Sequence, residues 1–246
     1  MTNTIERAAS LLRGAERVVV VTGAGVSAES GLPTFRTGAG QLWGGTNLER
    51  YGNPRGFRKH AADAWAWYEA RRGRAMAATP NAAHLAIVAI ERRAPRFHLV
   101  TQNIDGLHAR AGSVRLLEIH GSLARVRCFD CRQVSDWPAL HVARPPHCDA
   151  CGGLLRPDVV LFEESLDPDL LEEAFDAAES CDLLLSVGTS HVVQPAASLV
   201  TDRVRRGQPV IVVNPELDGL HERDVVFLGG PAGEILPALV SEAWPG

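Results

Sequence analysis

A run of β-branched residues that leads directly into a glycine-rich turn constrains the fold of this chain more than any other feature. Residues 17–22 read Arg-Val-Val-Val-Val-Thr, a continuous pattern typical of a parallel strand covered on both faces. The next residues, Gly23-Ala24-Gly25-Val26-Ser27-Ala28, match G-x-G-x-x-A. In that motif glycines let backbone N–H groups approach a phosphate at a helix N-terminus. The two segments together predict a nucleotide-binding strand and turn.

Strand-like and helix-like patterns alternate along most of the chain. Besides the first strand, we expect strands at 97–100, 114–119, 158–162, 182–187, 209–213 and 224–228, and helices at 3–13, 82–93, 167–180, 195–206 and from about 231. Such alternation predicts an α/β fold, a Rossmann-like doubly wound parallel sheet with helices on both faces.

The segment after the glycine-rich turn argues against an ordinary dehydrogenase. Hydride-transferring Rossmann proteins carry a second strand about 20 residues on that ends in an acidic residue. Here residues 38–45 are Gly-Ala-Gly-Gln-Leu-Trp-Gly-Gly. A long loop of this kind is usually functional, and we expect Phe35 and Arg36 to face a ligand.

Polar residues follow two predicted strands that should end at the same sheet edge. Gln102, Asn103 and Asp105 come after one strand, and His120 with Gly121 after the other. Ligands bind at this edge in open α/β sheets, so an imidazole, amides and a carboxyl group are expected to converge there. The alternative, a simple turn and a strand-end histidine bonded to a backbone carbonyl, is about as probable from these residues alone.

Three later strands also end in small polar residues. These are Gly188-Thr189-Ser190, Asn214-Pro215-Glu216 and the stretch from Gly229 to Ala232. Glycine with hydroxyl, amide and carboxyl groups suits a ribose and adenine site. Each stretch alone could equally be turn chemistry.

Four of the five cysteines have metal-site spacing. Cys128-x2-Cys131 and Cys148-x2-Cys151 are separated by 16 residues, the pattern of a four-thiolate zinc site. Four protein ligands leave no open position, so one structural zinc ion is expected. The alternative is a redox pair, which would not need a second pair. Cys181 is expected to be a small buried hydrophobe.

Tyr68 and Arg71 are three positions apart in a helical pattern and share a face. A phenol beside a guanidinium suits a carboxylate ligand. Since Arg71 lies in the run Arg71-Arg72-Gly73-Arg74, the alternative from these residues alone is a solvated basic face.

Composition excludes several classes of protein. The chain has 246 residues, 46% of them hydrophobic and 22% charged, with a net charge of −4, which is ordinary for a globular enzyme and offers no electrostatic case for binding nucleic acid. Neither a signal peptide nor an apolar run long enough to span a membrane is visible. We expect a cytoplasmic monomer.

The motifs of this chain resemble those of the sirtuin family. The matching stretches, in chain order, are Gly23–Arg36, Thr101–His108, His120-Gly121, the four cysteines, Gly188–Ser190, Gln194–Ala196 and Asn214. The resemblance covers residues from about 14 to 240. It implies NAD-dependent removal of acyl groups from protein lysines. It also implies a Rossmann-like NAD-binding domain formed by residues 1–45, 80–121 and 156–246. The small domain would consist of a helical part (46–79) and a zinc-binding part (122–155).

The resemblance also implies roles for single residues. The acyl oxygen would first attack ribose C1′ as nicotinamide leaves. His120 would then act as the general base on a ribose hydroxyl, and Asn103 would assist. The products would be lysine, nicotinamide and 2′-O-acyl-ADP-ribose. The NAD-binding residues would be Gly23, Ala24, Gly25, Ser27, Thr34, Phe35, Arg36, Trp43, Gln102, Asn103, Ile104, Asp105, His120, Gly188, Thr189, Ser190, Asn214, Pro215, Glu216 and Ala232.

Tyr68 and Arg71 fall where the desuccinylase and demalonylase branch of the family carries a Tyr-x-x-Arg pair. The resemblance therefore implies a preference for succinyl-, malonyl- or glutaryl-lysine over acetyl-lysine. Alternatives are a protein ADP-ribosyltransferase that uses the same NAD site and a binding module that senses NAD without turnover. One departure concerns peptide binding, because related chains usually read Phe-Gly-Glu where this one has Phe162-Glu163-Glu164.

Overall fold

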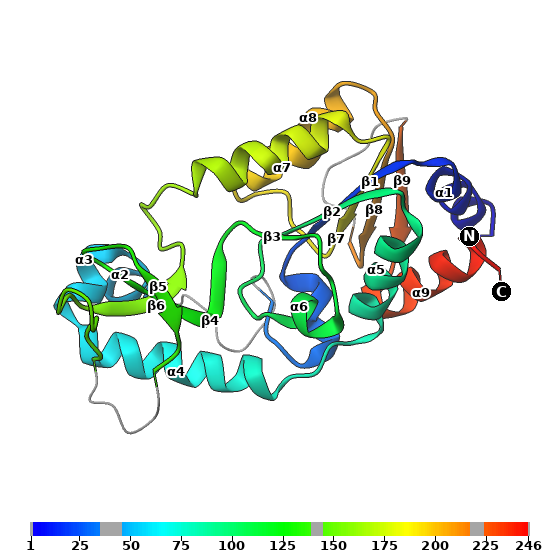
Figure 1. Cartoon of the computed structure of the whole chain (residues 1–246). Helices are drawn as coiled ribbons and strands as arrows, with labels where there is room; N and C mark the ends of the chain where they lie inside the picture. The colour runs from blue at the N-terminus through cyan, green and yellow to red at the C-terminus, as the bar shows by residue number, and fades with distance from the viewer. Residues whose placement is uncertain (1, 35–45, 139–144, 217–223, 246) are drawn as a thin grey trace.

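The computed structural model describes residues 2–34, 46–138, 145–216 and 224–245. A parallel sheet of six strands forms its larger part, in the order β3-β2-β1-β7-β8-β9 (Figure 1). This confirms the predicted Rossmann-like fold. The strands are β1 (Arg17–Thr22), β2 (Arg96–Thr101), β3 (Leu116–Glu118), β7 (Leu183–Val187), β8 (Val210–Asn214) and β9 (Val225–Gly229).

The direction in which strands are added reverses between β1 and β7. The chain first builds outward from β1 to β2 and β3, then returns to place β7 on the other side of β1. Ligands of doubly wound sheets bind at such a switch point, beyond the carboxyl ends of the strands. The glycine-rich turn after β1 lies at this position.

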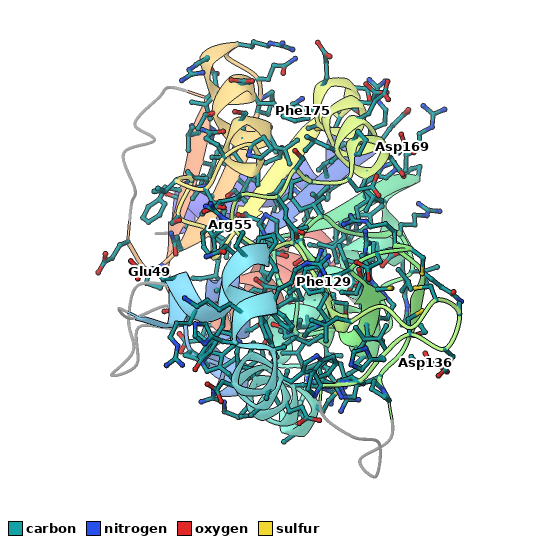
Figure 2. The ribbon with its side chains drawn as sticks, turned by 90° about the vertical axis from the view of Figure 1, so that its left-hand side faces the viewer. Glu49, Arg55, Phe129, Asp136, Asp169 and Phe175 are labelled. Carbon is teal, nitrogen blue, oxygen red and sulfur yellow. The ribbon has the colours of Figure 1, made fainter. Side chains whose placement is uncertain are left out.

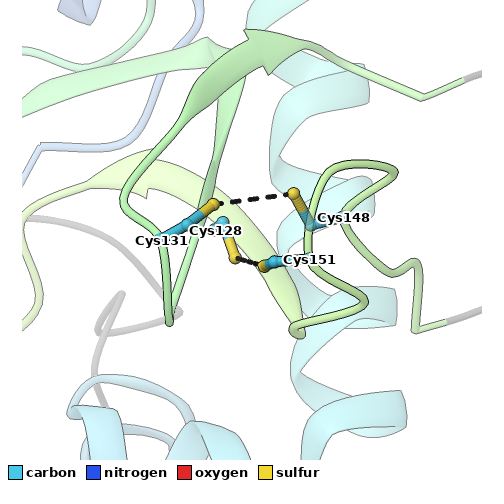
Figure 3. Close-up of side chains that lie close together, drawn as sticks. All are labelled: Cys128, Cys131, Cys148 and Cys151. Atoms are coloured by element: carbon cyan, nitrogen blue, oxygen red, sulfur yellow. Dashed lines mark hydrogen bonds between the residues drawn. The ribbon is translucent and has the colours of Figure 1, made fainter.

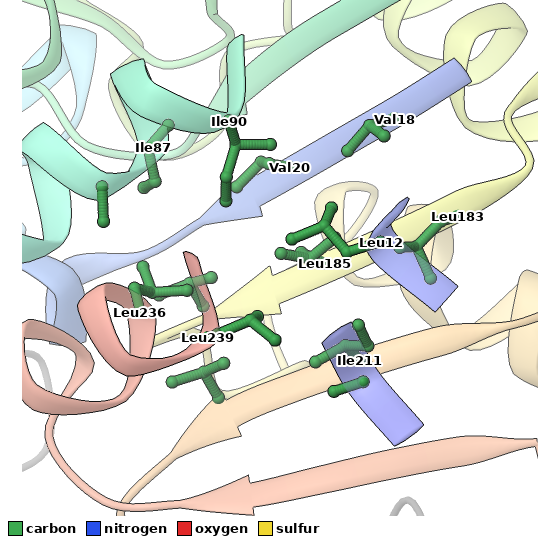
Figure 4. Close-up of a cluster of buried hydrophobic side chains, with 14 of the residues drawn as sticks. Leu12, Val18, Val20, Ile87, Ile90, Leu183, Leu185, Ile211, Leu236 and Leu239 are labelled. Atoms are coloured by element: carbon green, nitrogen blue, oxygen red, sulfur yellow. The ribbon is translucent and has the colours of Figure 1, made fainter. Parts of the chain in front are cut away.

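Helices cover both faces of the sheet because alternate residues of β1 point to opposite sides. Val18 and Val20 belong to one apolar core, with Leu12 and Ile87 (Figure 4). Val19 and Val21 belong to the core on the other face, against which Phe175 packs (labelled in Figure 2). The first face carries α1 (Thr2–Gly14), α5 (Ala82–Arg93) and α9 (Ala232–Ala243), and the second α7 (Pro168–Ser180) and α8 (Ala196–Arg205).

A second, antiparallel sheet has the strand order β5-β4-β6. It consists of β4 (Gly121–Cys128), β5 (Val134–Asp136) and β6 (Leu155–Val159). The helices α2 (Thr46–Tyr51), α3 (Pro54–Lys59) and α4 (Ala61–Ala77) complete this smaller part. Trp65 of α4 is fully buried against it and donates a hydrogen bond to the carbonyl oxygen of Leu155 at 2.8 Å.

The prediction of a parallel strand at 158–162 was wrong. The strand spans Leu155–Val159 and pairs antiparallel with β4 in the small sheet. Its polar residues Arg156 and Asp158 are buried and form ion pairs, with Glu164 and with two arginines of β4. The hydrophobic pattern therefore did not predict the start of the strand. Only its pairing with β4 shows that the strand belongs to the small sheet.

The remaining described elements are short. A 3-10 helix, η1 (Ala24–Ser30), follows the first turn, and α6 (Leu107–Ala111) follows β2. The predicted helix at 82–93 is confirmed as α5, with Asn81 as its N-cap, whose side chain accepts hydrogen bonds from the amides of Ala83 and His84. No helix in the described ranges is long and apolar enough to cross a membrane.

Candidate active site

A cavity of about 1240 Å³ lies where the carboxyl ends of the parallel strands meet the small sheet. Every predicted NAD-binding or acyl-binding residue that the structure describes lines this cavity. They are Gly23, Ala24, Gly25, Ser27, Thr34, Tyr68, Arg71, Gln102, Asn103, Ile104, Asp105, His120, Gly188, Thr189, Ser190, Asn214, Pro215, Glu216 and Ala232. Three further predicted residues, Phe35, Arg36 and Trp43, lie outside the described residues.

The glycine-rich turn is packed against the end of β7. The amide of Gly23 donates to the carbonyl of Val187 at 3.1 Å, and that of Gly25 to the carbonyl of Gly188 at 2.8 Å. A Cβ atom on Gly25 would lie 2.6 Å from the Cα of Gly188, so a side chain cannot fit there. The glycines thus allow two strand ends to approach closely. A 3-10 helix, which contains Gly25, begins where the motif predicted the start of an ordinary helix.

Asn103, Ser27 and Asp105 form a buried hydrogen-bonded network on one wall. The side-chain amide of Asn103 donates to the hydroxyl of Ser27 at 3.1 Å and to the carbonyl of Gly23 at 3.1 Å. Ser27 in turn donates to a carboxylate oxygen of Asp105 at 2.8 Å. Burial raises the pKa of Asp105, while hydrogen bonds from the Leu107 amide and Ser27 counteract this. The network links the first turn to the end of β2 and holds both against the cavity.

His120 lies between β3 and β4, where the chain passes from the large sheet to the small one. Its Nδ1 atom is 2.9 Å from the carbonyl oxygen of Gln102. A carbonyl oxygen can only accept, so Nδ1 carries the proton and Nε2 keeps the lone pair. Burial lowers the pKa of His120, and the bond to Gln102 partly opposes that effect. The ring is therefore neutral near pH 7 and able to accept a proton.

Thr189 joins the strand ends on the other side of the switch point. Its hydroxyl accepts a hydrogen bond from the side-chain amide of Gln102 at 3.0 Å. Its main-chain oxygen accepts one from the side chain of Asn214 at 3.2 Å. The ends of β2, β7 and β8 are thus connected through polar side chains at the edge of the cavity.

Tyr68 and Arg71 project from α4 into the same cavity as His120. Tyr68 is 1% exposed, and its hydroxyl donates to the carbonyl of Tyr51 at 3.5 Å. The guanidinium of Arg71 lies 4.5 Å from the ring centre of Trp67. The pKa of Arg71 is lowered to about 10, mainly by burial and to a smaller extent by the charge of Arg74. The pair thus places a phenol and a buried cation together, as the shared helix face predicted.

The four cysteines form one cluster in the small part of the molecule (Figure 3). All their sulfur atoms lie within 4.8 Å of one another; Cys128 and Cys151 are 3.5 Å apart, and Cys131 and Cys148 are 3.7 Å apart. Tetrahedral zinc with Zn–S bonds of about 2.3 Å requires sulfur separations of about 3.8 Å. The arrangement therefore fits one zinc ion with four thiolate ligands.

Sequence reasoning missed some features of the site. Arg74 lines the cavity, although the sequence grouped it with a basic run. Apolar residues such as Leu123 and Leu161 also line it, and nothing in their pattern separates them from core residues. His84 and His108 are buried side by side beneath the site, with ring centres 4.8 Å apart. Their positions in two separate helical segments offered no signal of this contact.

The sheet with its switch-point cavity, the glycine-rich turn and the four-cysteine module define a Rossmann-like protein of the nucleotide-binding class with a zinc-ribbon module. Residues 23–195 match the Sir2 family. The chain belongs to this family, as the resemblance to sirtuins predicted.

Known relatives agree over nearly the whole chain. An "NAD-dependent protein deacylase 1" from Pseudomonas aeruginosa is 47% identical, with 96% of this chain and 98% of the relative covered. A solved Sir2 homologue in complex with NAD is 41% identical, with a TM-score of 0.87 and coverage of 97% and 93%. A solved Sir2 protein bound to a myristoylated histone peptide is 35% identical, with a TM-score of 0.76 and coverage of 99% and 97%.

Proposed function

We propose that this protein is an NAD-dependent protein-lysine deacylase that prefers acidic acyl groups, such as succinyl, malonyl and glutaryl, over acetyl. The observation that carries the catalytic part is the geometry of His120, whose Nδ1 atom is engaged by Gln102. This leaves a basic Nε2 atom on a ring that lines the cavity. The names of the relatives, which include NAD-dependent protein deacylases, support the same activity.

The cavity has the groups that a dinucleotide needs. Its volume of about 1240 Å³ leaves room for NAD and an acyl-lysine side chain together. The glycines of the turn have no side chains, so a ligand can approach the backbone at the switch point. Asn214 and Glu216 offer polar groups at the end of β8. When bound, NAD supplies the ADP-ribosyl group that accepts the acyl group as nicotinamide leaves.

The residues of the chain then have separate tasks. His120 takes a proton from a ribose hydroxyl at Nε2, while Gln102 maintains the tautomer. Asn103 is held by Ser27 and Gly23, so that its side chain is fixed at the wall of the cavity, where it would meet bound NAD. The four cysteines hold one structural zinc ion and take no part in the chemistry, because all four ligand positions are filled by protein.

Tyr68 and Arg71 carry the proposed acyl selectivity. A carboxylate attracts a half-buried guanidinium, and it accepts stronger hydrogen bonds from a guanidinium and a phenol than a neutral acyl group does. Both residues line the cavity that contains His120, so the proposed base and the acyl-binding pair share one pocket. A dicarboxylic acyl group brings an opposite charge to the cation, whereas an acetyl group does not.

Product analysis tests the proposal. The protein is incubated with NAD and a succinyl-lysine peptide, and the products are weighed by mass spectrometry. Nicotinamide with succinyl-ADP-ribose and free lysine peptide is the expected result. ADP-ribosylated protein would instead indicate the alternative, a transferase that uses the same NAD site, and binding of NAD without any product would indicate a sensor.

A further inference from the structure

Glu163 adopts a backbone conformation that usually belongs to glycine. Its φ angle is +72°, in the left-handed region that most side chains avoid. Residues in such sparsely populated backbone conformations cluster at active sites. Glu163 lines the cavity, yet its side chain is 57% exposed. The carboxylate therefore stands at the rim, between the cavity and solvent.

The loop around Glu163 does not need that carboxylate for its own structure. Glu164 accepts a hydrogen bond from the amide of Leu161 at 2.9 Å and pairs with the buried Arg156 at 2.9 Å. The amide of Phe162 donates to the carbonyl of Gly52 at 2.8 Å. These bonds anchor the loop on both sides of residue 163, so they would remain if the Glu163 side chain changed.

The same loop starts beside His120. The amide of Val160 donates to the carbonyl of His120 at 3.0 Å, and Glu163 follows three residues later, within about 11 Å along the chain. An extended acyl-lysine side chain that reaches His120 leaves its polypeptide at the surface. The residues next to the acyl-lysine then meet the exposed rim, which includes Glu163 and the 44% exposed Phe162.

The charge partner of Glu163 is weakly held. Arg55 of α3, labelled in Figure 2, lies 3.4 Å from the carboxylate, and its side chain is 87% exposed. Such surface pairs contribute little and are screened by salt. A cationic side chain of a bound substrate can replace Arg55 at small cost, whereas an anionic side chain is repelled.

We propose that Glu163 is a specificity residue that favours polypeptide substrates with an arginine or lysine close to the acylated lysine. This inference rests on the proposed deacylase function and adds the chemistry of the substrate chain to it. The acyl group is selected inside the cavity by Tyr68 and Arg71, and the flanking sequence is selected at the rim by Glu163. The two selections are independent because they act on different parts of the substrate.

Three succinyl-lysine peptides that differ only in the flanking residues test the inference: arginine, glutamine or glutamate on both sides. For the unmodified protein, kcat/KM should be about two- to five-fold higher with arginine than with glutamine, and lower with glutamate, as expected for an exposed charge pair. The preference should shrink in high salt. Glu163→Gln and Glu163→Gly should both abolish it, Glu163→Lys should reverse it, and Arg55→Gln should increase it.

Glu179→Gln is the matched control, because Glu179 also forms an exposed pair with an arginine, Arg206, and is not among the residues that line the cavity. It should leave the preference unchanged. Equal kcat/KM ratios for the unmodified protein and Glu163→Gln, with the glutamine peptide still turned over, would overturn the inference and leave the deacylase function intact. Failure to turn over any of the three peptides would instead overturn the proposed function, and this inference with it.

Discussion

The Nδ1 atom of His120 lies 2.9 Å from the main-chain oxygen of Gln102. This bond joins the second residue after β3 to the first residue after β2, so two neighbouring strand ends hold one imidazole ring. The same Gln102 donates through its side chain to Thr189, beyond β7. The orientation of the proposed base is thus tied to the switch point of the sheet.

His120→Ala should abolish deacylation without unfolding the protein, since the ring is held mainly by one hydrogen bond. Loss of a general base typically costs about 100- to 10,000-fold in rate. The measurement is kcat/KM with a succinyl-lysine peptide, with thermal unfolding as the control for folding. Turnover that survives the substitution would remove His120 from the mechanism.

The pH dependence of kcat/KM should reflect the environment of His120. Burial lowers the pKa of the ring, so the neutral form that accepts a proton persists to lower pH than for an ordinary histidine. The acidic limb of the profile is therefore expected below pH 6.5. A limb well above that value would assign the titration to another group.

Arg71→Met should remove the preference for acidic acyl groups and spare residual deacetylation. A lost charge-assisted hydrogen bond lowers the succinyl-to-acetyl ratio of kcat/KM by about 10- to 100-fold. Arg72→Met is the control, because Arg72 lies 4.9 Å from the ring centre of Trp137 and is not among the cavity-lining residues. Equal loss on both acyl peptides in Arg71→Met would contradict the selectivity.

Removal of zinc should unfold the small sheet and abolish activity. The cysteines connect the segment after β4 to the loop before β6, and structural zinc sites contribute directly to folding. We expect one zinc per chain by elemental analysis, and loss of the metal in the Cys148→Ala variant. Cys181→Ala, which changes a buried cysteine outside the cluster, should keep its zinc.

The buried pair His84 and His108 should make the fold sensitive to acid. Burial lowers their pKa values, to about 4 for His84 and about 3 for His108, where the charge of His84 contributes as well. Below pH 6.5 these histidines bind protons in the unfolded chain but not in the folded one. The free energy of unfolding therefore falls by up to about 1.4 kcal/mol per histidine and pH unit, until the pKa of the folded state is reached.

Urea unfolding between pH 7 and pH 5 measures this slope. His84→Gln should lower it by about a third, because His108 and His120, whose pKa values burial also lowers, still contribute. An equal slope in His84→Gln and the unmodified protein would exclude the pair as its source.

Gly25→Ala should destabilise the protein and impair NAD binding, because the new Cβ would lie 2.6 Å from the Cα of Gly188. Gly14→Ala, where a Cβ would have nothing within 4 Å, is the matched control and should behave as the unmodified protein. The comparison uses thermal unfolding with and without NAD. Equal unfolding temperatures would show that the two strand ends can separate.

Local patterns determined much of the fold and of the candidate site. The apolar run of β1 with its glycine-rich turn, and the spacing of the four cysteines, each depend on residues that are close in the chain, and the structure has them as predicted in the described ranges. The polar strand ends could be grouped in advance for a similar reason, because parallel strands all point their carboxyl ends to one edge.

Contacts between distant segments were decided only by the tertiary structure. The strand of residues 155–159 joined the small sheet because its buried Arg156 and Asp158 found partners on β4 and at Glu164, which no local pattern encodes. The tilted ring contact between His84 and His108 and the left-handed backbone of Glu163 likewise depend on how separate elements pack. The sequence determines which secondary structure each segment prefers by itself. The pairing of charges and rings between distant segments depends on distances that are set only when the chain has folded.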